Sequence, residues 1–336
     1  MRILAIESTC DETAAAVIEN LGAGFKVVTN VVASSAVIHQ KYGGVVPEVA
    51  AREQVKSIIP VINEALINIK MDSIDAIAVS YGPGLMGSLL VGIETAKVLA
   101  WTWKKPLIGV NHMAAHVAAN WIVTEEKGRV PQTPAVGLVV SGGHTDLILI
   151  RDNNNWEWIG GTRDDAAGEA FDKAARILGL PYPGGPSIQK AIEEINNDSI
   201  EKFKLPRPMI HDKTLEMSFS GLKAALNKLV SQVKPNNEEI KLLAKEFNNA
   251  VVDVLVNKTL SAREKYAVKC VLVAGGVAAN KSLREKLKDI IPAEQLFVPE
   301  LKYCGDNAAM VGAAALMSPK EVEPKFLKPN PGLATV

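Results

Sequence analysis

The chain has 336 residues, 48% of them apolar and 22% charged, which is enough to bury a large core in one large domain or in two lobes. Its 37 basic and 37 acidic side chains balance, so no overall field attracts nucleic acid, and any RNA contact has to come from a local patch. The three cysteines, Cys10, Cys270 and Cys304, show no C-x-x-C spacing, which favours a reducing, cytoplasmic location over a disulfide scaffold.

The first half of the chain begins with a strand–turn–strand pattern. Residues 2–7 and 13–18 are apolar and flank the polar turn Ser8-Thr-Cys-Asp-Glu12, which predicts a β-hairpin, and residues 26–33 predict a third strand. Glu7 also interrupts the apolar run too early for a signal peptide.

Helical patterns follow the hairpin. Apolar residues recur at spacings of three and four over residues 47–69, which predicts a helix with a kink at Pro60. Residues 74–80 predict a strand that leads through Gly82-Pro-Gly84 into a long helix over residues 85–103. Because charged side chains lie inside this helix, we expect it in a core and not in a membrane.

Two of the five histidines, His112 and His116, stand four residues apart. Residues 106–110 predict a buried strand and residues 112–123 a helix, on which positions i and i+4 share one face. Two imidazoles there can bind one metal ion at the end of a strand, where ligands of α/β folds usually bind. Spacing by chance or for packing is the alternative interpretation.

The strand–turn–strand pattern returns in the second half. Residues 135–140 and 146–150 flank another polar turn, Ser141-Gly-Gly-His-Thr145, and the apolar residues 269–274 lead to Gly275-Gly276. The repeat predicts a duplicated α/β fold whose lobes close on a nucleotide.

We therefore predict lobes at residues 1–125 and 130–318, with the boundary in the polar stretch 124–134. Residues 319–336 contain four prolines and predict an irregular tail.

Each polar turn has a functional and a plain interpretation. Backbone N–H groups of such turns can cradle phosphate oxygens, and Gly142 and Gly143 permit close approach and positive φ, but ordinary hairpin turns look the same. Asp11 and Glu12 in the first turn repel bare phosphate, so they better suit a metal-linked water, an ammonium group or an attacking amine.

Three further segments combine acidic or small residues. Asp164-Asp-Ala-Ala-Gly-Glu-Ala-Phe-Asp-Lys173 leads into a helix with acids on one face, although acids early in a helix also favour its dipole. The loop Tyr182-Pro-Gly-Gly-Pro186 can bring backbone close to a ligand or can be a plain turn. Residues 274–280 can also lie close to a ligand, with Asn280 hydrogen-bonded to a sugar hydroxyl, but tight packing of a strand and a helix would need the same small residues. Asp306 can cap a helix over residues 308–317 or give the histidines a carboxylate partner; such a ligand set suits Zn²⁺ or Fe²⁺.

A series of motifs resembles one family, in the same order from residue 1 to about 317. The motifs are Glu7-Ser-Thr-Cys-Asp-Glu-Thr13, His39-Gln-Lys-Tyr-Gly-Gly-Val-Val-Pro-Glu48, Gly82-Pro-Gly-Leu85, Gly109-Val-Asn-His-Met-Ala-Ala-His116, Val140-Ser-Gly-Gly-His-Thr145, Asp164-Asp-Ala-Ala-Gly-Glu-Ala-Phe-Asp-Lys173, Tyr182-Pro-Gly-Gly185, Ser218-Phe-Ser-Gly-Leu-Lys223 and Gly275-Gly-Val-Ala-Ala-Asn280. Together they are similar to the bacterial branch of the tRNA N6-adenosine threonylcarbamoyltransferases, the TsaD family.

The resemblance implies an actin-like ATPase (ASKHA) fold, with two duplicated lobes around a nucleotide cleft. It implies transfer of a threonylcarbamoyl group from threonylcarbamoyl-AMP to the exocyclic amine of adenosine 37 in tRNAs that read ANN codons, with release of AMP. It further implies three protein partners, namely the smaller paralogous subunit TsaB, the P-loop ATPase TsaE and an upstream threonylcarbamoyl-AMP synthase.

The resemblance also implies roles for individual residues. His112, His116 and Asp306 would bind one divalent metal, Fe²⁺ or Zn²⁺. The adenylate, or an ATP or ADP analogue in its place, would be bound by Val139, Val140, Ser141, Gly142, Gly143, Asp172, Gly185 and Asn280. Asp11 or Glu12 is our candidate for the catalytic base or positioning group. Gln54 stands where many relatives carry histidine, and we expect its helix to face the partner subunit, so that Gln54 affects partner contacts more than chemistry.

Three other functions compete with this one. A sugar kinase or actin-like ATPase gives no reason for the histidine pair. A zinc peptidase, an old label of this family, needs His-Glu-x-x-His, whereas Met113 follows His112. A non-catalytic scaffold has no need of the intact pair. A basic cluster near residues 202–213 can contact tRNA, but a solvated charged face is our preferred interpretation of it. Its members are Lys202, Lys204, Arg207 and Lys213.

Overall fold

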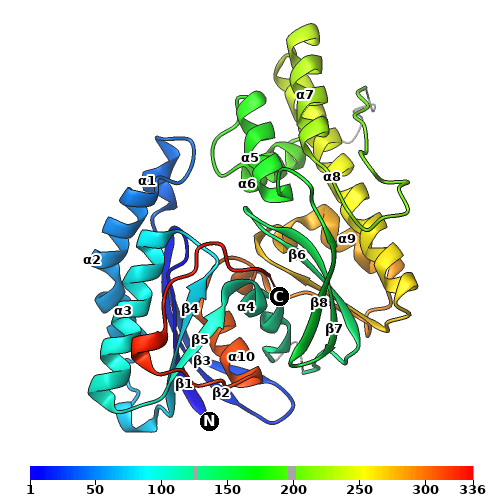
Figure 1. Ribbon diagram of the computed structural model, residues 1–336. Coiled ribbons are helices and arrows are strands. Elements are labelled where there is room, and N and C mark those ends of the chain that lie inside the picture. The colour runs from blue at the N-terminus through cyan, green and yellow to red at the C-terminus, as the bar shows by residue number, and fades with distance from the viewer. Residues whose placement is uncertain (125–127, 196–201, 336) are drawn as a thin grey trace. The chain divides into compact units, whose positions relative to one another are not determined.

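The computed structural model describes residues 1–124, 128–195 and 202–335 and divides into two compact units. Unit 1 comprises Met1–Pro131, Asp152–Asn155 and Pro299–Val336, and unit 2 comprises Gln132–Arg151 and Trp156–Val298. Each unit is built around a five-stranded sheet with helices packed on it (Figure 1).

The sheet of unit 1 has the strand order β3-β2-β1-β4-β5. Its strands are β1 (Arg2–Glu7), β2 (Glu12–Asn20), β3 (Phe25–Ser34), β4 (Ala76–Gly82) and β5 (Leu107–Asn111). Its α-helices are α1 (Ala36–Gln40), α2 (Pro47–Ala65), α3 (Met86–Trp103), α4 (His112–Ala118) and α10 (Ala308–Met317). Short 3-10 turns are η1 (Met71–Ser73), η2 (Ala119–Trp121), η4 (Leu301–Tyr303) and η5 (Pro324–Phe326).

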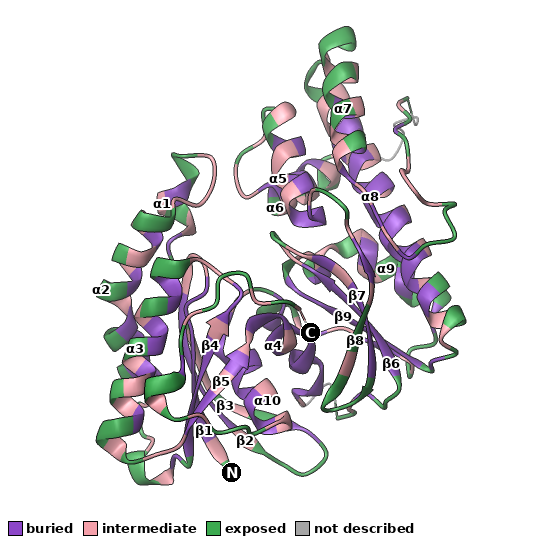
Figure 2. Ribbon diagram, viewed as in Figure 1, coloured by how far each residue is buried: buried purple, intermediate pink, exposed green. Residues whose placement is uncertain are grey.

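Strand β1 is buried along nearly its whole length because helices cover both faces of the sheet. Leu4 and Ile6 belong to the core that the sheet forms with α2 and α3. Ala5 lies on the opposite face, against Gly312 of α10. This alternation follows the two-residue period of a strand. In Figure 2 the strands are mostly buried and the outer faces of α2 and α3 are exposed.

Unit 2 repeats this plan, with the strand order β10-β9-β6-β7-β8. Its strands are β6 (Ala135–Val140), β7 (Thr145–Asp152), β8 (Asn155–Gly161), β9 (Cys270–Ala274) and β10 (Leu296–Phe297). Its helices are α5 (Ala167–Ile177), α6 (Gly184–Glu193), α7 (Ser220–Val233), α8 (Asn237–Lys265) and α9 (Lys281–Ile290), with the 3-10 turn η3 (Gly276–Ala279).

The strand pairings confirm the predicted duplication. In unit 1, β1 pairs antiparallel with β2 and parallel with β4, which pairs parallel with β5. In unit 2, β6 pairs antiparallel with β7 and parallel with β9, which pairs parallel with β10. Both polar turns therefore follow the first strand of a unit, as the sequence predicted.

Two predicted helices are shorter in the structure. The helix predicted over residues 47–69 ends at Ala65, shortly before Asn68, which has a φ of 63°. The helix predicted over residues 112–123 ends at Ala118 and continues as the 3-10 turn Ala119–Trp121. The structure also contains β8, α6, α7 and α8, for which the sequence analysis had no expectation.

The two units differ from the predicted lobes at residues 299–318, which group with unit 1. The reason is α10, which packs against α4, β1 and β2. Gly312 permits this packing, because a Cβ there would lie 2.2 Å from Cγ2 of Ile18. The tail after α10 is irregular, as predicted, and its Asn330 N–H donates to the carbonyl of Tyr81 at the end of β4. Among the described helices, none combines the length and apolarity that crossing a membrane requires.

Candidate functional site

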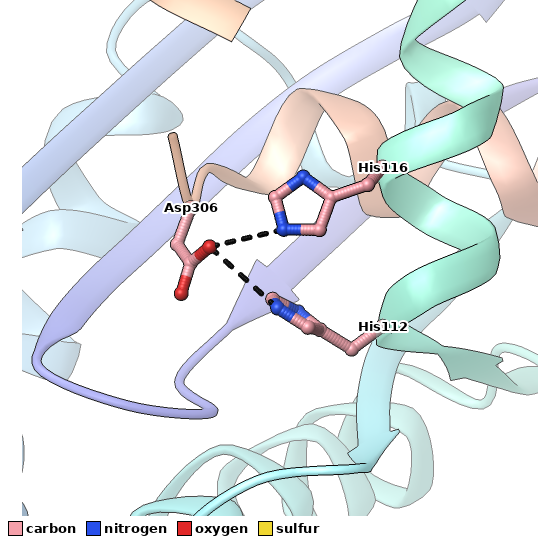
Figure 3. Close-up of side chains that lie close together, drawn as sticks. All are labelled: His112, His116 and Asp306. Carbon is pink, nitrogen blue, oxygen red and sulfur yellow. Dashed lines mark ion pairs between the residues drawn. The ribbon is translucent and has the colours of Figure 1, made fainter. Parts of the chain in front are cut away.

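His112, His116 and Asp306 converge in unit 1, as Figure 3 shows. Both histidines lie on α4, whose first turn is capped by the Asn111 side chain, which accepts hydrogen bonds from the N–H groups of Met113 and Ala114. Asp306 precedes α10. The distance from Asp306 Oδ1 to Nε2 is 3.5 Å for His112 and 3.2 Å for His116. The ligand atoms of all three residues lie within 4.8 Å of one another.

These three side chains fit a metal ion. Two ligand atoms that each lie about 2.1 Å from a tetrahedral metal are about 3.4 Å apart, which is close to the distances from Asp306 Oδ1 to the Nε2 atoms of His112 and His116. His116 is buried, its Nδ1 has no hydrogen-bond partner among the described residues, and its Nε2 lies 3.2 Å from Asp306 Oδ1 without the geometry of a hydrogen bond. A buried imidazole without such a partner is costly unless it binds a cation. The group is therefore suited to a divalent metal, with two nitrogens and one oxygen as donors.

A second carboxylate, Glu7, orients His112 from the other side of the ring. Its Oε2 lies 3.0 Å from Nδ1 of His112, which leaves Nε2 to face Asp306. Glu7 is fully buried and accepts hydrogen bonds from the Ser80 hydroxyl and the Thr9 N–H, both at 2.6 Å. Carboxylates that bond the outer nitrogen of a metal-binding histidine fix its tautomer and its orientation. The sequence analysis gave Glu7 no role, although an acid that ends an apolar strand was a visible signal.

The electrostatics of the group favour a positive charge. Burial lowers the pKa of His112, but the carboxylates of Glu7 and Asp306 outweigh burial and raise that pKa to about 9. Burial raises the pKa of Asp306, and the two imidazoles outweigh it and lower that pKa to about 2. Burial raises the pKa of Glu7, but the charge of His112 and the hydrogen bonds of His112 and Ser80 together outweigh burial and hold that pKa below its usual value.

The turn Ser8–Glu12, which leads from β1 into the first residue of β2, carries Asp11 and Glu12, both only partly exposed. Burial, and then the carboxylates of Asp306 and Asp11, raise the pKa of Glu12 to about 9. The Glu12 carboxylate accepts a hydrogen bond from Ser34. The electrostatic effect of Asp306 on Glu12 links this turn to the histidine–aspartate group within unit 1.

Gln54 lies on α2 but is 1% exposed, so the expectation that it affects partner contacts is wrong. That α2 faces a partner stays a prediction. Its amide nitrogen donates to the carbonyls of Ser8, Cys10 and Glu12. From the sequence, a polar residue on a helix is expected on the side that faces solvent. The sequence does not show that Gln54 contacts a distant turn instead.

In unit 2, the predicted adenylate-binding residues gather around the end of β6. Val139 and Val140 are fully buried in β6, so the exposed atoms of this segment belong to Ser141, Gly142 and Gly143. A Cβ on either Gly142 or Gly143 would meet no atom within 4 Å, which leaves open space over this turn. Neither glycine has a positive φ, so the freedom that they give this turn is the open space and not a left-handed backbone.

Neighbouring segments pack closely against this turn. The N–H of Gly168 in α5 donates to the Ser141 carbonyl, and a Cβ at Gly168 would lie 2.8 Å from Cα of Gly142. Gly275, with a φ of 90°, lies so close to Val140 that a Cβ would be 2.3 Å from the Val140 carbonyl oxygen. The ends of β6 and β9 and the start of α5 therefore meet at one point of unit 2.

The other three predicted residues lie on elements that border this point. Asp172 of α5 accepts a hydrogen bond from the N–H of Gly184, and a Cβ at Gly185 would meet open space. The Asn280 side chain caps α9 by accepting from the N–H of Leu283 and donates to Asn248. Asn280 thus has a structural role, and each polar atom keeps capacity for one more hydrogen bond.

The motif that begins at Asp164 is hydrogen-bonded to the motif that begins at Ser218. The Asp164 carboxylate accepts hydrogen bonds from the hydroxyls of Ser218 and Ser220 and from two backbone N–H groups at the start of α7. In the basic cluster, Lys202 pairs with Glu239, and Arg207 pairs with Glu246 and Asp253. These ion pairs favour the charged-face interpretation of the cluster.

Sequence comparison shows which known proteins the whole chain is similar to. The model of a family described as TsaD, tRNA N6-adenosine threonylcarbamoyltransferase, matches residues 26–313. A curated relative of that name from Listeria welshimeri is 49% identical over 324 residues, covering 94% of this chain and 91% of the relative. Another from Geobacillus thermodenitrificans is 47% identical over 343 residues, covering 99% of this chain and 97% of the relative.

Solved structures show the same fold at low identity. Full-length HypF in its phosphate- and nucleotide-bound form has a TM-score of 0.56 and 13% identity, covering 98% of this chain and 47% of HypF. HypF of T. kodakarensis has a TM-score of 0.53 and 14% identity, covering 94% of this chain and 48% of that protein. The chain thus spans about half the length of HypF. The likeness and the repeated strand order confirm the predicted actin-like fold class.

Proposed function

The chain belongs to the tRNA N6-adenosine threonylcarbamoyltransferase family and is therefore a tRNA-modifying transferase, and we propose that its donor is threonylcarbamoyl-AMP and its acceptor is adenosine 37 of tRNAs that read ANN codons. What carries this proposal beyond the family match is the convergence of His112, His116 and Asp306. The buried Met113 occupies the position where a zinc peptidase of the His-Glu-x-x-His type has its general base.

His112, His116 and Asp306 would hold one divalent metal, either Fe²⁺ or Zn²⁺. When bound, the metal supplies a Lewis acid that can neutralise charge on oxygens of the donor and polarise its carbonyl. Glu7 keeps the imidazole of His112 in the orientation that this binding needs.

The adenylate would be bound by unit 2, through the residues predicted from the sequence. The open space over Gly142, Gly143 and Gly185 supports this, because backbone without side chains lets a ligand come close. Ser141 would contribute backbone groups from the turn that Val139 and Val140 lead into, and Asp172 and Asn280 would contribute side chains.

The reaction balances without a covalent enzyme intermediate. The adenosine amine forms a C–N bond with the carbamoyl carbon, the bond from that carbon to the phosphate oxygen breaks, and AMP leaves with the electron pair. The amine loses one proton. Asp11 or Glu12, both in the turn after β1, would accept that proton, and the other would position the amine.

The protein would act in the cytoplasm with TsaB, TsaE and the synthase that makes the donor. An exposed apolar surface on α2 and α3 supports a protein partner, because such surfaces commonly mark interfaces. Its side chains include Val55, Ile59, Leu90, Val98 and Trp101.

The test is single-turnover transfer from threonylcarbamoyl-AMP to tRNA, with the partners supplied. We expect modified adenosine and AMP in equal amounts from the wild-type chain, and none from the double variant His112→Ala/His116→Ala. Transfer of phosphate from ATP to a sugar, without modification of tRNA, would indicate a kinase instead. Unchanged transfer in both Asp11→Asn and Glu12→Gln would remove these two residues from the reaction.

A further inference from the structure

The turn Ser8–Glu12 is held by its carbonyl groups. The carbonyl of Thr9 accepts a hydrogen bond from the N–H of Leu85, and that of Asp11 accepts from both the N–H and the hydroxyl of Ser35. The three remaining carbonyls, of Ser8, Cys10 and Glu12, accept from Gln54. The structure thus fixes every carbonyl of this turn with a donor from elsewhere in unit 1.

Gln54 has the largest share of this anchoring. Its Nε2 lies 3.3 Å from the Ser8 carbonyl, 3.0 Å from that of Cys10 and 2.9 Å from that of Glu12. An amide nitrogen has two hydrogens, so three acceptors share them. The opposite amide orientation would put Oε1 against three carbonyl oxygens and is excluded by repulsion. Oε1 has no hydrogen-bond partner among the described residues, so it is the nitrogen that holds this side chain in place.

The alternating acceptors explain why one atom can hold the turn. Carbonyls at positions 8, 10 and 12 all reach the same nitrogen, so the chain bends around it. The Ser88 hydroxyl adds a second donor to the Cys10 carbonyl, whereas among the described residues Gln54 is the side chain that donates to the carbonyls of Ser8 and Glu12. Removing the amide therefore removes the side-chain donor from the carbonyls at both ends of the turn that carries Asp11 and Glu12.

We propose that Gln54 is a positioning residue for the transfer reaction, because its amide nitrogen fixes the turn that presents Asp11 and Glu12. This rests on the proposed function in giving those two acids a role at the attacking amine. Gln54 touches neither the metal ligands nor Glu7 through any hydrogen bond of the described structure, so its loss affects the turn and leaves the metal group intact.

The experiment compares Gln54→Met, which keeps the length and removes every donor, with Gln54→His, which keeps at least one ring N–H. Gln132→Met is the matched control, because Gln132 is exposed before β6. We measure single-turnover transfer at saturating donor and tRNA, metal content, and hydrogen exchange of residues 8–12. A displacement of a reacting group by about 1 Å can cost about 100-fold in rate.

We expect transfer to fall about 100-fold in Gln54→Met and about tenfold in Gln54→His, with full metal content and faster exchange confined to the turn. The control should match the wild type. Transfer within about threefold of the wild type in Gln54→Met, or parallel loss of metal in both variants, would overturn the inference. If Gln54→Met does not fold, the same measurements on Gln54→His decide.

The two proposals can fail separately. A wild-type chain that transfers nothing, with the partners present, contradicts the proposed function. Hydrogen exchange still tests Gln54 in that case, because unchanged exchange of residues 8–12 in Gln54→Met would show that the amide does not hold the turn.

Discussion

The two units end their first strand in turns of the same topology but different chemistry. In unit 1, β1 ends in the buried acid Glu7, and the turn after it carries Asp11 and Glu12. In unit 2, β6 ends in Val140, and the turn after it exposes Gly142 and Gly143. The same scaffold thus presents carboxylates in one unit and bare backbone in the other. Carboxylates suit cations and proton transfer, whereas bare backbone suits a bulky anionic ligand.

The halves also differ after their last strand. In unit 1, β5 leads directly into α4 with its two histidines. In unit 2, the two-residue strand β10 leads back into unit 1, where Asp306 completes the histidine group. A duplicated fold has therefore placed all three metal-binding candidates in one unit. The variants below test this division of labour, from the largest expected effect to the smallest.

Removing a metal ligand should abolish metal binding in unit 1 and leave the structure of unit 2 unchanged. We expect His116→Ala to lose its metal and to lower single-turnover transfer at least about 1,000-fold, because two remaining ligands do not hold a catalytic metal. His211→Ala, in an exposed loop of unit 2, is the control and should keep both. Elemental analysis and transfer assays measure the two effects. Full metal content in His116→Ala would show that the metal binds elsewhere.

Weakening the support of a ligand should have a smaller effect. In Glu7→Gln, His112 keeps a neutral hydrogen-bond partner but loses the carboxylate, so we expect metal affinity to fall about 10- to 100-fold. Competition with a chelator measures this. Glu19→Gln, on β2 and paired with Arg2, is the control. Equal affinities in Glu7→Gln and the wild type would reduce Glu7 to a buried structural acid.

The sequence predicted the strands and turns that carry these features because their signals are local. Neighbouring residues alone predict the strands at residues 2–7 and 135–140 and the turns after them, without any distant contact. The histidine spacing likewise predicted one shared helix face, and the structure confirms that His112 and His116 both approach Asp306.

What the sequence could not show depends on contacts between distant segments. Helix α10 consists of apolar residues all around, so no polar face indicates which sheet it covers. Gln54 is polar on a helix, which suggests solvent, but its partners lie more than 40 residues away in the turn. Glu7 was visible as an acid at the end of a buried strand, yet only the fold brings Ser80 and His112 to it.

Filling the open space in unit 2 should affect nucleotide binding and leave unit 1 unchanged. Gly142→Val adds a side chain where the structure has no neighbouring atom within 4 Å of a Cβ, so the unfolding midpoint should stay the same. If the adenylate lies on this turn, affinity for AMP should fall about tenfold, because the backbone can no longer approach the ligand. Calorimetric titration with AMP measures this. Gly128→Val, at another open position, is the control, and equal AMP affinity in both variants would move the ligand away from the turn.

The smallest effect should come from an acid of unit 2 that holds loops together. Burial raises the pKa of Asp164, but hydrogen bonds from Ser218, the Phe219 N–H and Ser220 outweigh it and lower that pKa to about 2. Because the folded protein favours the ionised form, the stabilisation is complete above about pH 4 and disappears as the pH falls towards 2. Solvent screening of this exposed carboxylate limits it to about 1 kcal/mol.

Urea unfolding of Asp164→Asn should therefore show a deficit that is constant from pH 5 to pH 7 and shrinks below about pH 4. Asp289→Asn, on the exposed end of α9, should show no such pattern. Metal content should stay the same in both variants, because Asp164 lies in the unit without the metal group. A deficit that grows as the pH falls would mean that the neutral carboxyl is the form that stabilises the loop, and loss of metal in Asp164→Asn would break the division between the two units.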